Sequence, residues 1–421
     1  MNTLYLFLKY IIQAFAATKA KGETCMLYTK EEVFDFIEQE DVKFIRLFFC
    51  DIHGKQKNIS IMPTELGRAF EEGISFNASE ICGFDNAVYS DLLLFPIPST
   101  INILPWRPSH GKVVRMFCDI KHPDGTPFEK DSRLVLKNAV EEAKKHGITV
   151  QIGSEYEFYL FKTDTDGNPT KIPFDNAGYM DVAPDDRGEN VRREICLTLL
   201  DMGIITESSH HKEGPGQNEI DFRYSDALTN ADNDMNFLSV VRATAQHNGL
   251  YADFSPKPLE DRSGNGLHIN LSVKSEDKVS VTMPFMAGIL HHIKEITYFL
   301  NPTPESYKRL GNHNAPKYIT WSHENRSQLI RIPHMRSENE RIELRSPDPA
   351  ANPYIAYACL IYAGLDGIKK NLTPPPAVNY NLFKAGEEIT AGLEKLPETL
   401  EEARDIACSS KWLKSVFPFS I

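Results

Sequence analysis

The sequence predicts an α+β protein in which a small β-rich N-terminal domain precedes a large domain, built from an antiparallel half-barrel sheet backed by helices. Three observations lead to this prediction. Strand-like segments separated by prolines fill residues 44–104. Beyond residue 150, four segments alternate polar and apolar side chains with the period of a strand. Long stretches with helical spacing accompany those segments, at residues 187–202, 227–248, 283–300 and 353–370.

Composition and charge narrow the class of protein. The chain has 421 residues, of which 41% are hydrophobic and 25% charged, as is usual for a globular protein. Its net charge of -12 disfavours a surface for nucleic acid or anionic membrane, so we expect neither as a partner. The seven cysteines are scattered and never in C-x-x-C spacing, which indicates neither a disulfide framework nor a zinc site. These features favour a cytoplasmic protein.

We divide the chain into three parts. Residues 1–25 are an extension, unstructured or helical, because the apolar stretch within it is interrupted by Lys9 and is too short to span a bilayer. Residues 26–115 form the β-rich domain. Residues 116–421 form the large domain, after a change of composition near residues 105–110.

The segment GSEYEFYLF at residues 153–161 carries the first chemical signal. Alternation along a strand puts Glu155 and Glu157 on one face and Tyr156 and Phe158 on the other. The two carboxylates are then roughly 7 Å apart, a spacing that suits two hard cations side by side. An isolated E-x-E pattern is more often a solvated acidic face of an antiparallel strand, so the assignment depends on the other strands.

Three further segments repeat this alternation. Their polar faces carry acids, a histidine, an amide, a hydroxyl and arginines: Glu219, Asp221 and Arg223; His268, Asn270 and Ser272; Arg341, Glu343 and Arg345. Because the helices must cover the apolar faces, the polar faces form one concave, charged surface. Carboxylates and imidazole without thiols suit Mg²⁺ or Mn²⁺, and arginines suit phosphate and carboxylate groups. The pattern predicts metal-assisted phosphoryl transfer involving an anionic substrate.

From about residue 26 to 397 the chain resembles the type I glutamine synthetases of bacteria and archaea. The motifs that carry the resemblance are GSEYEFYLF, GPGQNEIDFRY (214–224), GLHINLSV (266–273), SYKRL (306–310), NRSQLIRIP (325–333) and RIELRSPDPAANPY (341–354). The resemblance implies a β-grasp N-terminal domain and a catalytic half-barrel. It also implies a homo-oligomer of one hexameric ring or two stacked rings, with active sites shared between neighbouring subunits. The implied reaction uses ATP to phosphorylate the γ-carboxylate of L-glutamate, after which ammonia displaces the phosphate to give glutamine.

The resemblance assigns roles to single residues. One metal ion, nearer the ATP phosphates, takes Glu155, His268 and Glu343, and a second takes Glu157 and Glu219. Substrate glutamate is held by Gly264, His268, Arg309 and Arg345. The nucleotide is contacted by Glu207, Ser272, Arg331 and Arg341, and the transferring phosphoryl group by Arg326, Arg331 and Arg341. Asp51, delivered by the adjacent subunit, resembles the aspartate of the ammonium site.

Two positions depart from the family pattern. After His210-His211 the family has a glutamate that completes the second metal site, and this chain has Lys212 followed by Glu213. Either Lys212 turns away, or Glu213 takes its place, or the second metal binds poorly. In the lid that follows Leu310, Asn314 stands where the family has a glutamate that helps to deprotonate ammonium. An asparagine is no general base, so both departures predict reduced activity.

Three functions remain compatible with the sequence. The first is an ATP-dependent glutamate–ammonia ligase whose activity is impaired by Lys212 and Asn314. The second is a γ-glutamyl ligase for an organic amine, because a lid without its glutamate fits a larger nucleophile. The third is a non-catalytic relative that serves as an oligomeric binding or structural protein.

Overall fold

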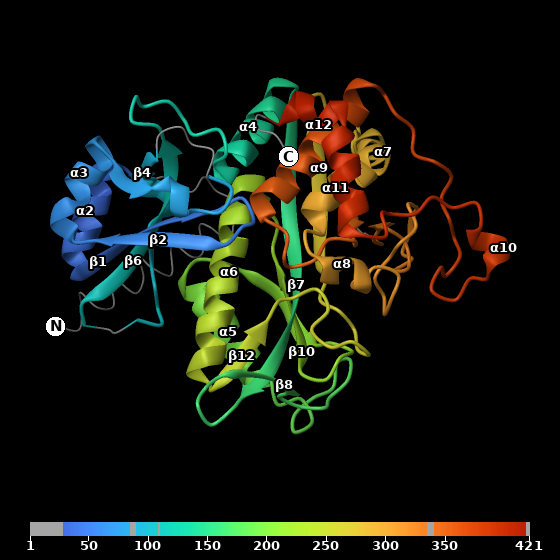
Figure 1. The fold of residues 1–421 in the computed structure, drawn as a ribbon, viewed down its shortest axis with the longest axis horizontal. Coiled ribbons are helices and arrows are strands. Elements are labelled where there is room, and N and C mark those ends of the chain that lie inside the picture. Colours follow the sequence, from blue (N-terminus) through green and yellow to red (C-terminus); the bar gives the residue numbers. More distant parts are fainter. Residues whose placement is uncertain (1–27, 85–89, 108–109, 335–340, 418–421) are drawn as a thin grey trace.

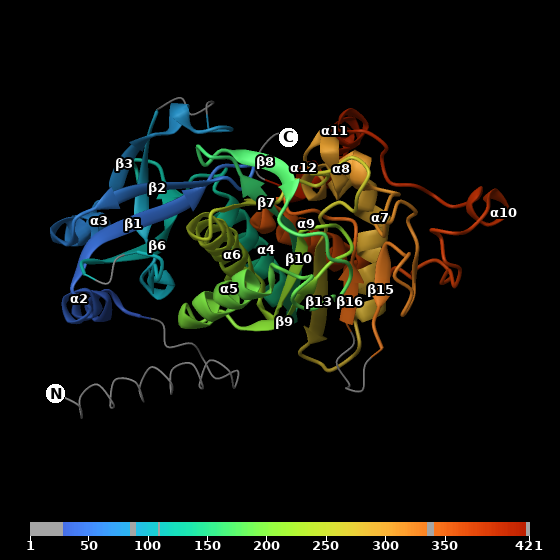
Figure 2. The same cartoon turned by 90° about the horizontal axis from the view of Figure 1, so that it is seen from below.

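The computed structural model describes residues 28–84, 90–107, 110–334 and 341–417. They form a small domain and a large one, each with its own hydrophobic core. Figure 1 shows the small domain beside helix α6 (Ala227–His247), with the strands of the larger sheet on the far side of that helix. Figure 2 shows the same arrangement from below. The predicted extension, residues 1–25, lies outside the described residues.

The N-terminal domain is a six-stranded sheet with short helices against it. Its strands follow the order β2-β1-β6-β4-β3, with β5 paired to β6. Their bounds are Val42–Cys50 (β1), Gln56–Ile61 (β2), Ile74–Asn77 (β3), Asp91–Pro96 (β4), Asn102–Ile103 (β5) and Lys112–Lys121 (β6). The helices are α2 (Lys30–Gln39), which starts at a capping box made by Thr29 and Glu32, and α3 (Leu66–Glu71). The boundary predicted between residues 115 and 116 falls inside β6, so this sheet continues to Lys121.

The large domain is built on a ten-stranded sheet. Its main path is β14-β15-β16-β13-β7-β10-β9, and β8, β11 and β12 also pair with the long central strand β7. The bounds are Ile148–Thr163 (β7), Pro169–Pro173 (β8), Thr206–His211 (β9), Gln217–Phe222 (β10), Ser225–Asp226 (β11), Leu250–Asp253 (β12), Leu267–Ser275 (β13), Trp321–His323 (β14), Ile330–Ile332 (β15) and Arg341–Leu344 (β16). All pairs are antiparallel except β14 with β15. The α+β class and the half-barrel sheet with helices behind it are confirmed. Arg223, expected on the polar face of β10, lies beyond the end of that strand.

Helices cover the apolar face of this sheet. They are α4 (Ser132–Lys145), α5 (Glu189–Asp201), α6, α7 (Thr282–Leu300), α9 (Pro353–Lys369), α11 (Leu400–Ser409) and α12 (Lys411–Val416). Two short helices lie outside this layer: α8 (Pro304–Arg309), and α10 (Glu387–Thr390), which has no buried residue. The strand residues Tyr156, Ile220, Ile269 and Ile342 are buried among the helices of the layer in one hydrophobic cluster. Several of these helices begin where a side chain caps them, as Asn352 does for α9. No helix in the described ranges combines the length and the apolar character needed to span a membrane.

Side-chain bonds join the helices to each other and to the first domain. The guanidinium of Arg133 on α4 donates to both carboxylate oxygens of Asp232 on α6, over 3.0 and 2.9 Å, and the hydroxyl of Tyr354 on α9 donates to the same carboxylate over 2.7 Å. Asn352 donates its amide to the carbonyl of Ile52, 3.1 Å away, in the turn between β1 and β2. The turn of the first domain is therefore fixed to the helical layer.

A buried polar network lies directly behind the central strand. Asp234 on α6 accepts hydrogen bonds from the hydroxyls of Ser154 on β7, over 2.6 Å, and of Tyr357 on α9. Asn230 donates to Ser154 over 3.1 Å and to Tyr357 over 3.0 Å. Burial raises the pKa of Asp234 to about 7, despite the two hydroxyl donors. Ser154 precedes Glu155, so this network fixes the strand that carries the acids.

Replacing Asp234 with asparagine should change how stability depends on pH. The folded carboxyl keeps its proton up to about pH 7, whereas the unfolded one loses it near pH 4, so this group's contribution to stability falls as pH rises through that window. An amide does not ionise. As pH rises from 5 to 8, the melting temperature of the wild type should therefore fall by a few degrees relative to that of Asp234→Asn, as measured by scanning fluorimetry.

Asp253→Asn is the matched control. Although burial acts in the other direction, the bonds to Lys171 and Ser255 lower the pKa of Asp253, so this carboxyl is ionised in both folded and unfolded protein above pH 5. Its difference from the wild type should stay constant over the same range. Parallel curves for Asp234→Asn and the wild type would contradict the assignment of a protonated Asp234.

Candidate active site

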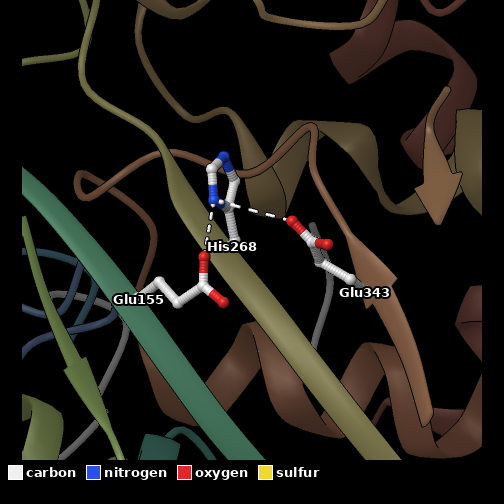
Figure 3. Close-up of side chains that lie close together, drawn as sticks. All are labelled: Glu155, His268 and Glu343. Atoms are coloured by element: carbon white, nitrogen blue, oxygen red, sulfur yellow. Dashed lines mark hydrogen bonds and ion pairs between the residues drawn. The ribbon is translucent and has the colours of Figure 1, made fainter. Parts of the chain in front are cut away.

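Three neighbouring strands bring two carboxylates and an imidazole together. His268 on β13 is paired in register with Glu155 on β7, and its neighbour Asn270 with Glu343 on β16. Figure 3 shows the three side chains converging, with Nδ1 of His268 3.0 Å from Oε2 of Glu155 and 3.7 Å from Oε1 of Glu343. Their ligand atoms all lie within 4.8 Å of one another. The predicted set Glu155, His268 and Glu343 is thus assembled in space.

The chemistry of this set fits a hard divalent cation. Burial would raise the pKa of Glu155, but the hydrogen bond from His268, followed by that from Asn270, lowers it to about 2. Burial and the charge of Arg345 lower the pKa of His268, which keeps the imidazole neutral and able to act as a ligand. Two carboxylates and a neutral imidazole are donors that Mg²⁺ or Mn²⁺ accepts.

A second acidic pair lies beside the first set, and a lysine fills it. Glu219 on β10 is paired in register with Glu157 on β7. Nζ of Lys212 lies 2.9 Å from Oε1 of Glu157 and 2.5 Å from Oε2 of Glu219. The charges of these carboxylates, working against burial, raise the pKa of Lys212, so the ammonium stays charged. In this arrangement the space between Glu157 and Glu219, the predicted second metal site, holds the ammonium of Lys212.

Glu213, the residue after Lys212, bonds to two other side chains. Oε2 of Glu213 accepts hydrogen bonds from the hydroxyl of Ser263, over 2.9 Å, and from the amide of Asn314, over 3.0 Å. Of the alternatives that the sequence left open, Lys212 does not turn away and Glu213 does not replace it. Asn314 instead ties the lid segment, residues 311–316, to the loop that carries Glu213.

Arg309 and two glycines form the wall next to Glu157. Arg309 is buried and donates to the carbonyl of Ser346 over 2.8 Å. A side chain at Gly264 would come within 2.9 Å of the Arg309 stem, and one at Gly266 within 2.7 Å of its guanidinium. The backbone N–H of Gly266 donates to Glu157 over 2.7 Å. The absence of a Cβ at both positions lets the loop approach Arg309.

The other predicted arginines lie on β15 and β16 or in the segments next to these strands. Arg331 and Arg345 both pair with the carboxylate of Glu343. Arg341 lies with its guanidinium carbon 4.5 Å from the centre of the Tyr224 ring, and its register partner on β13 is Ser272. Arg326 has an exposed side chain, and its carbonyl accepts from Arg345 over 3.0 Å.

Two predicted residues lie apart from these clusters. Glu207 is exposed on the edge strand β9. Asp51 lies in the turn after β1, where its carboxylate accepts from the backbone N–H groups of His53 and Lys55 over 3.0 and 2.9 Å. Because that turn packs on the helices α6 and α9, Asp51 is on the opposite side of the sheet from Glu155, His268 and Glu343. Within one protomer the structure does not bring Asp51 to the site.

Sequence reasoning left three contributing residues out of the site. Asn270 donates to Oε1 of Glu155 over 2.9 Å. Asp221 groups with Glu155 and Glu219, and burial together with the charge of Glu155 raises its pKa to about 7. Gly266 supplies the N–H for Glu157. The strand alternation placed Asn270 and Asp221 on the polar face, which was the available signal for both.

Comparison with protein families gives matches along most of the chain. The model described as "Glutamine synthetase, beta-Grasp domain" matches residues 41–123, and "Glutamine synthetase, catalytic domain" matches residues 129–421. A glutamine synthetase from Clostridium saccharobutylicum is 46% identical over 391 residues, covering 89% of this chain and 88% of that protein. One from Methanosarcina mazei is 45% identical over 401 residues, covering 92% and 90%.

The fold is also similar to that of solved structures. A structure titled "GmaS/ADP complex-Conformation 1" superposes with a TM-score of 0.82 at 28% identity, covering 91% of this chain and 92% of that one. The glutamine synthetase of Plasmodium falciparum superposes with a TM-score of 0.81 at 25% identity, covering 93% of each chain. With both domain models matched in order and relatives above 40% identity over most of the length, this chain belongs to the glutamine synthetase family.

Proposed function

We propose that Glu155, His268 and Glu343 hold the divalent ion, Mg²⁺ or Mn²⁺, that serves ATP-dependent synthesis of glutamine from glutamate and ammonia. The reaction follows from the family: the chain is a glutamate–ammonia ligase that uses ATP and a divalent metal. The observation that carries the site assignment is the convergence of three ligand atoms from three strands within 4.8 Å. The ion would supply positive charge against the phosphate oxygens of ATP.

The side chains around Glu155, His268 and Glu343 have separate proposed roles. Arg331 and Arg345 hold Glu343 ionised and oriented, since burial alone would raise its pKa but the charge of Arg345 lowers it. Arg331 on β15 and Arg341 on the adjacent strand β16 serve as cations for the transferring phosphoryl group, together with Arg326. Arg309 and Arg345 supply guanidinium groups for the carboxylates of glutamate, beside Gly264. Ser272 and Glu207 remain the proposed contacts to the nucleotide.

The direct test of the reaction is phosphate release. Purified protein with ATP, Mg²⁺ and glutamate should release phosphate faster when ammonium is added, with one glutamine formed for each phosphate. Release that ignores both glutamate and ammonium would contradict the assignment.

Replacing Glu343 with glutamine should abolish metal-dependent nucleotide binding. The change removes one of three ligands and leaves Arg331 and Arg345 without a counter-charge. In the wild type, ATP with Mg²⁺ should raise the melting temperature above the value with ATP alone, and in Glu343→Gln this difference should vanish. The exposed Glu260 lies in a nearby loop, so Glu260→Gln is a matched control that should keep the full effect. Mg²⁺-dependent protection of Glu343→Gln would refute the ligand role.

We further propose a ring of protomers in which Asp51 completes the neighbouring active site as the ammonium-binding carboxylate. Its position on the helical side of its own sheet supports this, because it cannot reach its own metal ligands from there. A head-to-tail contact that closes on itself produces a ring, such as a hexamer, alone or stacked on a second ring. The ring also makes each site depend on two chains.

Mixed oligomers test the shared site. Asp51→Asn and Glu343→Gln are each expected to be inactive as homo-oligomers. When the two chains are co-expressed in equal amounts, about one site in four combines an intact Glu343 with an intact Asp51 from its neighbour. Activity should return to about a quarter of the wild-type value, whereas the same homo-oligomers mixed after assembly should stay inactive. No recovery on co-expression would show that Asp51 acts within its own chain, and an active Asp51→Asn homo-oligomer would show that it does not act at all.

One observation favours a second acceptor. In the lid, the amide of Asn314 bonds to Glu213, so position 314 offers no carboxylate to an ammonium ion. An organic amine is then a candidate acceptor. Phosphate release with methylamine or ethylamine in place of ammonium decides between the two, since an ammonia ligase should prefer ammonium by at least tenfold in kcat/KM.

A further inference from the structure

We infer that the ammonium of Lys212 takes the place of a second divalent cation in this active site, so that each protomer binds one such ion. Glu157, Glu219 and His268 offer ligand atoms that lie within 4.8 Å of one another, all from buried residues. The position that a cation would occupy between the two carboxylates is filled by Nζ of Lys212, at 2.9 and 2.5 Å. The inference rests on the proposed function only for the identity of the first ion.

Lys212 is held in place through its backbone. Its N–H donates to the carbonyl of Gln217 over 2.8 Å, and its own carbonyl lies 2.7 Å from Nδ1 of His211. His211 in turn is fixed by Asp175, whose carboxylate lies 2.9 Å from Nε2. The lysine side chain is only 19% exposed. A lysine anchored in this way stays with its two carboxylates instead of sampling solvent.

An ammonium can replace part of what a metal ion does. It supplies one positive charge, which is paired with the carboxylates of Glu157 and Glu219, and three N–H donors. At least one of these N–H groups points away from the two carboxylates. That N–H is left for an anionic group of the substrate, as a charge-assisted hydrogen bond. Unlike a divalent ion, the ammonium is part of the chain and does not have to bind from solution. This half of the site therefore carries a positive charge without metal. Lys212 is therefore a positioning cation, and a metal ion could enter only by displacing it.

Metal stoichiometry tests the inference without turnover. Titration of the full-length protein with Mn²⁺, followed by calorimetry and by electron paramagnetic resonance, should give one ion per protomer without coupling between ions. Lys212→Glu should bind two ions per protomer, with spectra broadened by the second ion nearby. Lys294→Glu changes the charge of an exposed lysine on α7 and should still bind one. Two ions per protomer in the wild type would overturn the inference, whatever the catalytic activity.

Lys212→Met is the second variant, in case the acidic side chain in Lys212→Glu disturbs folding. It removes the ammonium but keeps the Glu157 and Glu219 pair, so a second Mn²⁺ should bind. Binding of glutamate, measured by calorimetry at a Mn²⁺ concentration that fills only the first site, should weaken at least tenfold and recover when excess Mn²⁺ fills the second. Failure of Lys212→Met to bind a second ion would overturn the inference, and so would unchanged binding of glutamate. A protein that binds one ion but forms no glutamine would contradict the proposed function and leave this inference standing.

Discussion

The central constraint on this structure is the compensation of negative charge on one face of β7. Glu155 and Glu157 project from that strand, Glu219 and Asp221 lie on the adjacent strand β10, and Glu343 lies on β16, one strand beyond β13. Two unit charges about 4 Å apart interact by about 4 kcal/mol at an effective dielectric constant near 20, so such a group of acids needs cations among them or the protonation of some members, as the raised pKa values of Asp221 and Glu219 indicate. Lys212, Arg331 and Arg345 provide the positive charge within the chain.

The negative charge is compensated differently around Glu343 and between Glu157 and Glu219. Around Glu343 the cations are Arg331 and Arg345, which pair with its carboxylate. The imidazole of His268 is neutral and remains available as a ligand. Between Glu157 and Glu219 the cation is the lysine ammonium itself. The first of these places is open to a metal ion, and the second is neutralised by the protein. The departure from the family pattern at position 212 therefore places a fixed positive charge between two carboxylates of the chain.

The opposite face of the sheet keeps this charged surface in register. Tyr156, Ile220 and Ile269 are buried against the helices, and Asp234 ties Ser154 to α6 and α9. A slip of one residue along β7 would put Tyr156 among the acids and the acids in the apolar core. The strands that carry Glu155, His268 and Glu343 are consequently held by the core packed against their other face. Arg133, Asp232 and Tyr354 add a buried charge-assisted bond between helices that further limits movement of this layer.

The sequence by itself determined the fold class, the long helices and the polar face of each strand, because all of these follow from the local periods of strand and helix. The family motifs determined which acids share a site with His268. The sequence showed that Lys212 replaces an acid, but it could not decide between a lysine that turns away and one that points inward. Only the tertiary structure decided that, since the direction depends on the bonds of His211 and Gln217 and on two acids brought from separate strands. The engagement of Glu213 with Asn314, and the placement of Asp51 behind its own sheet, depend in the same way on residues far apart in the chain.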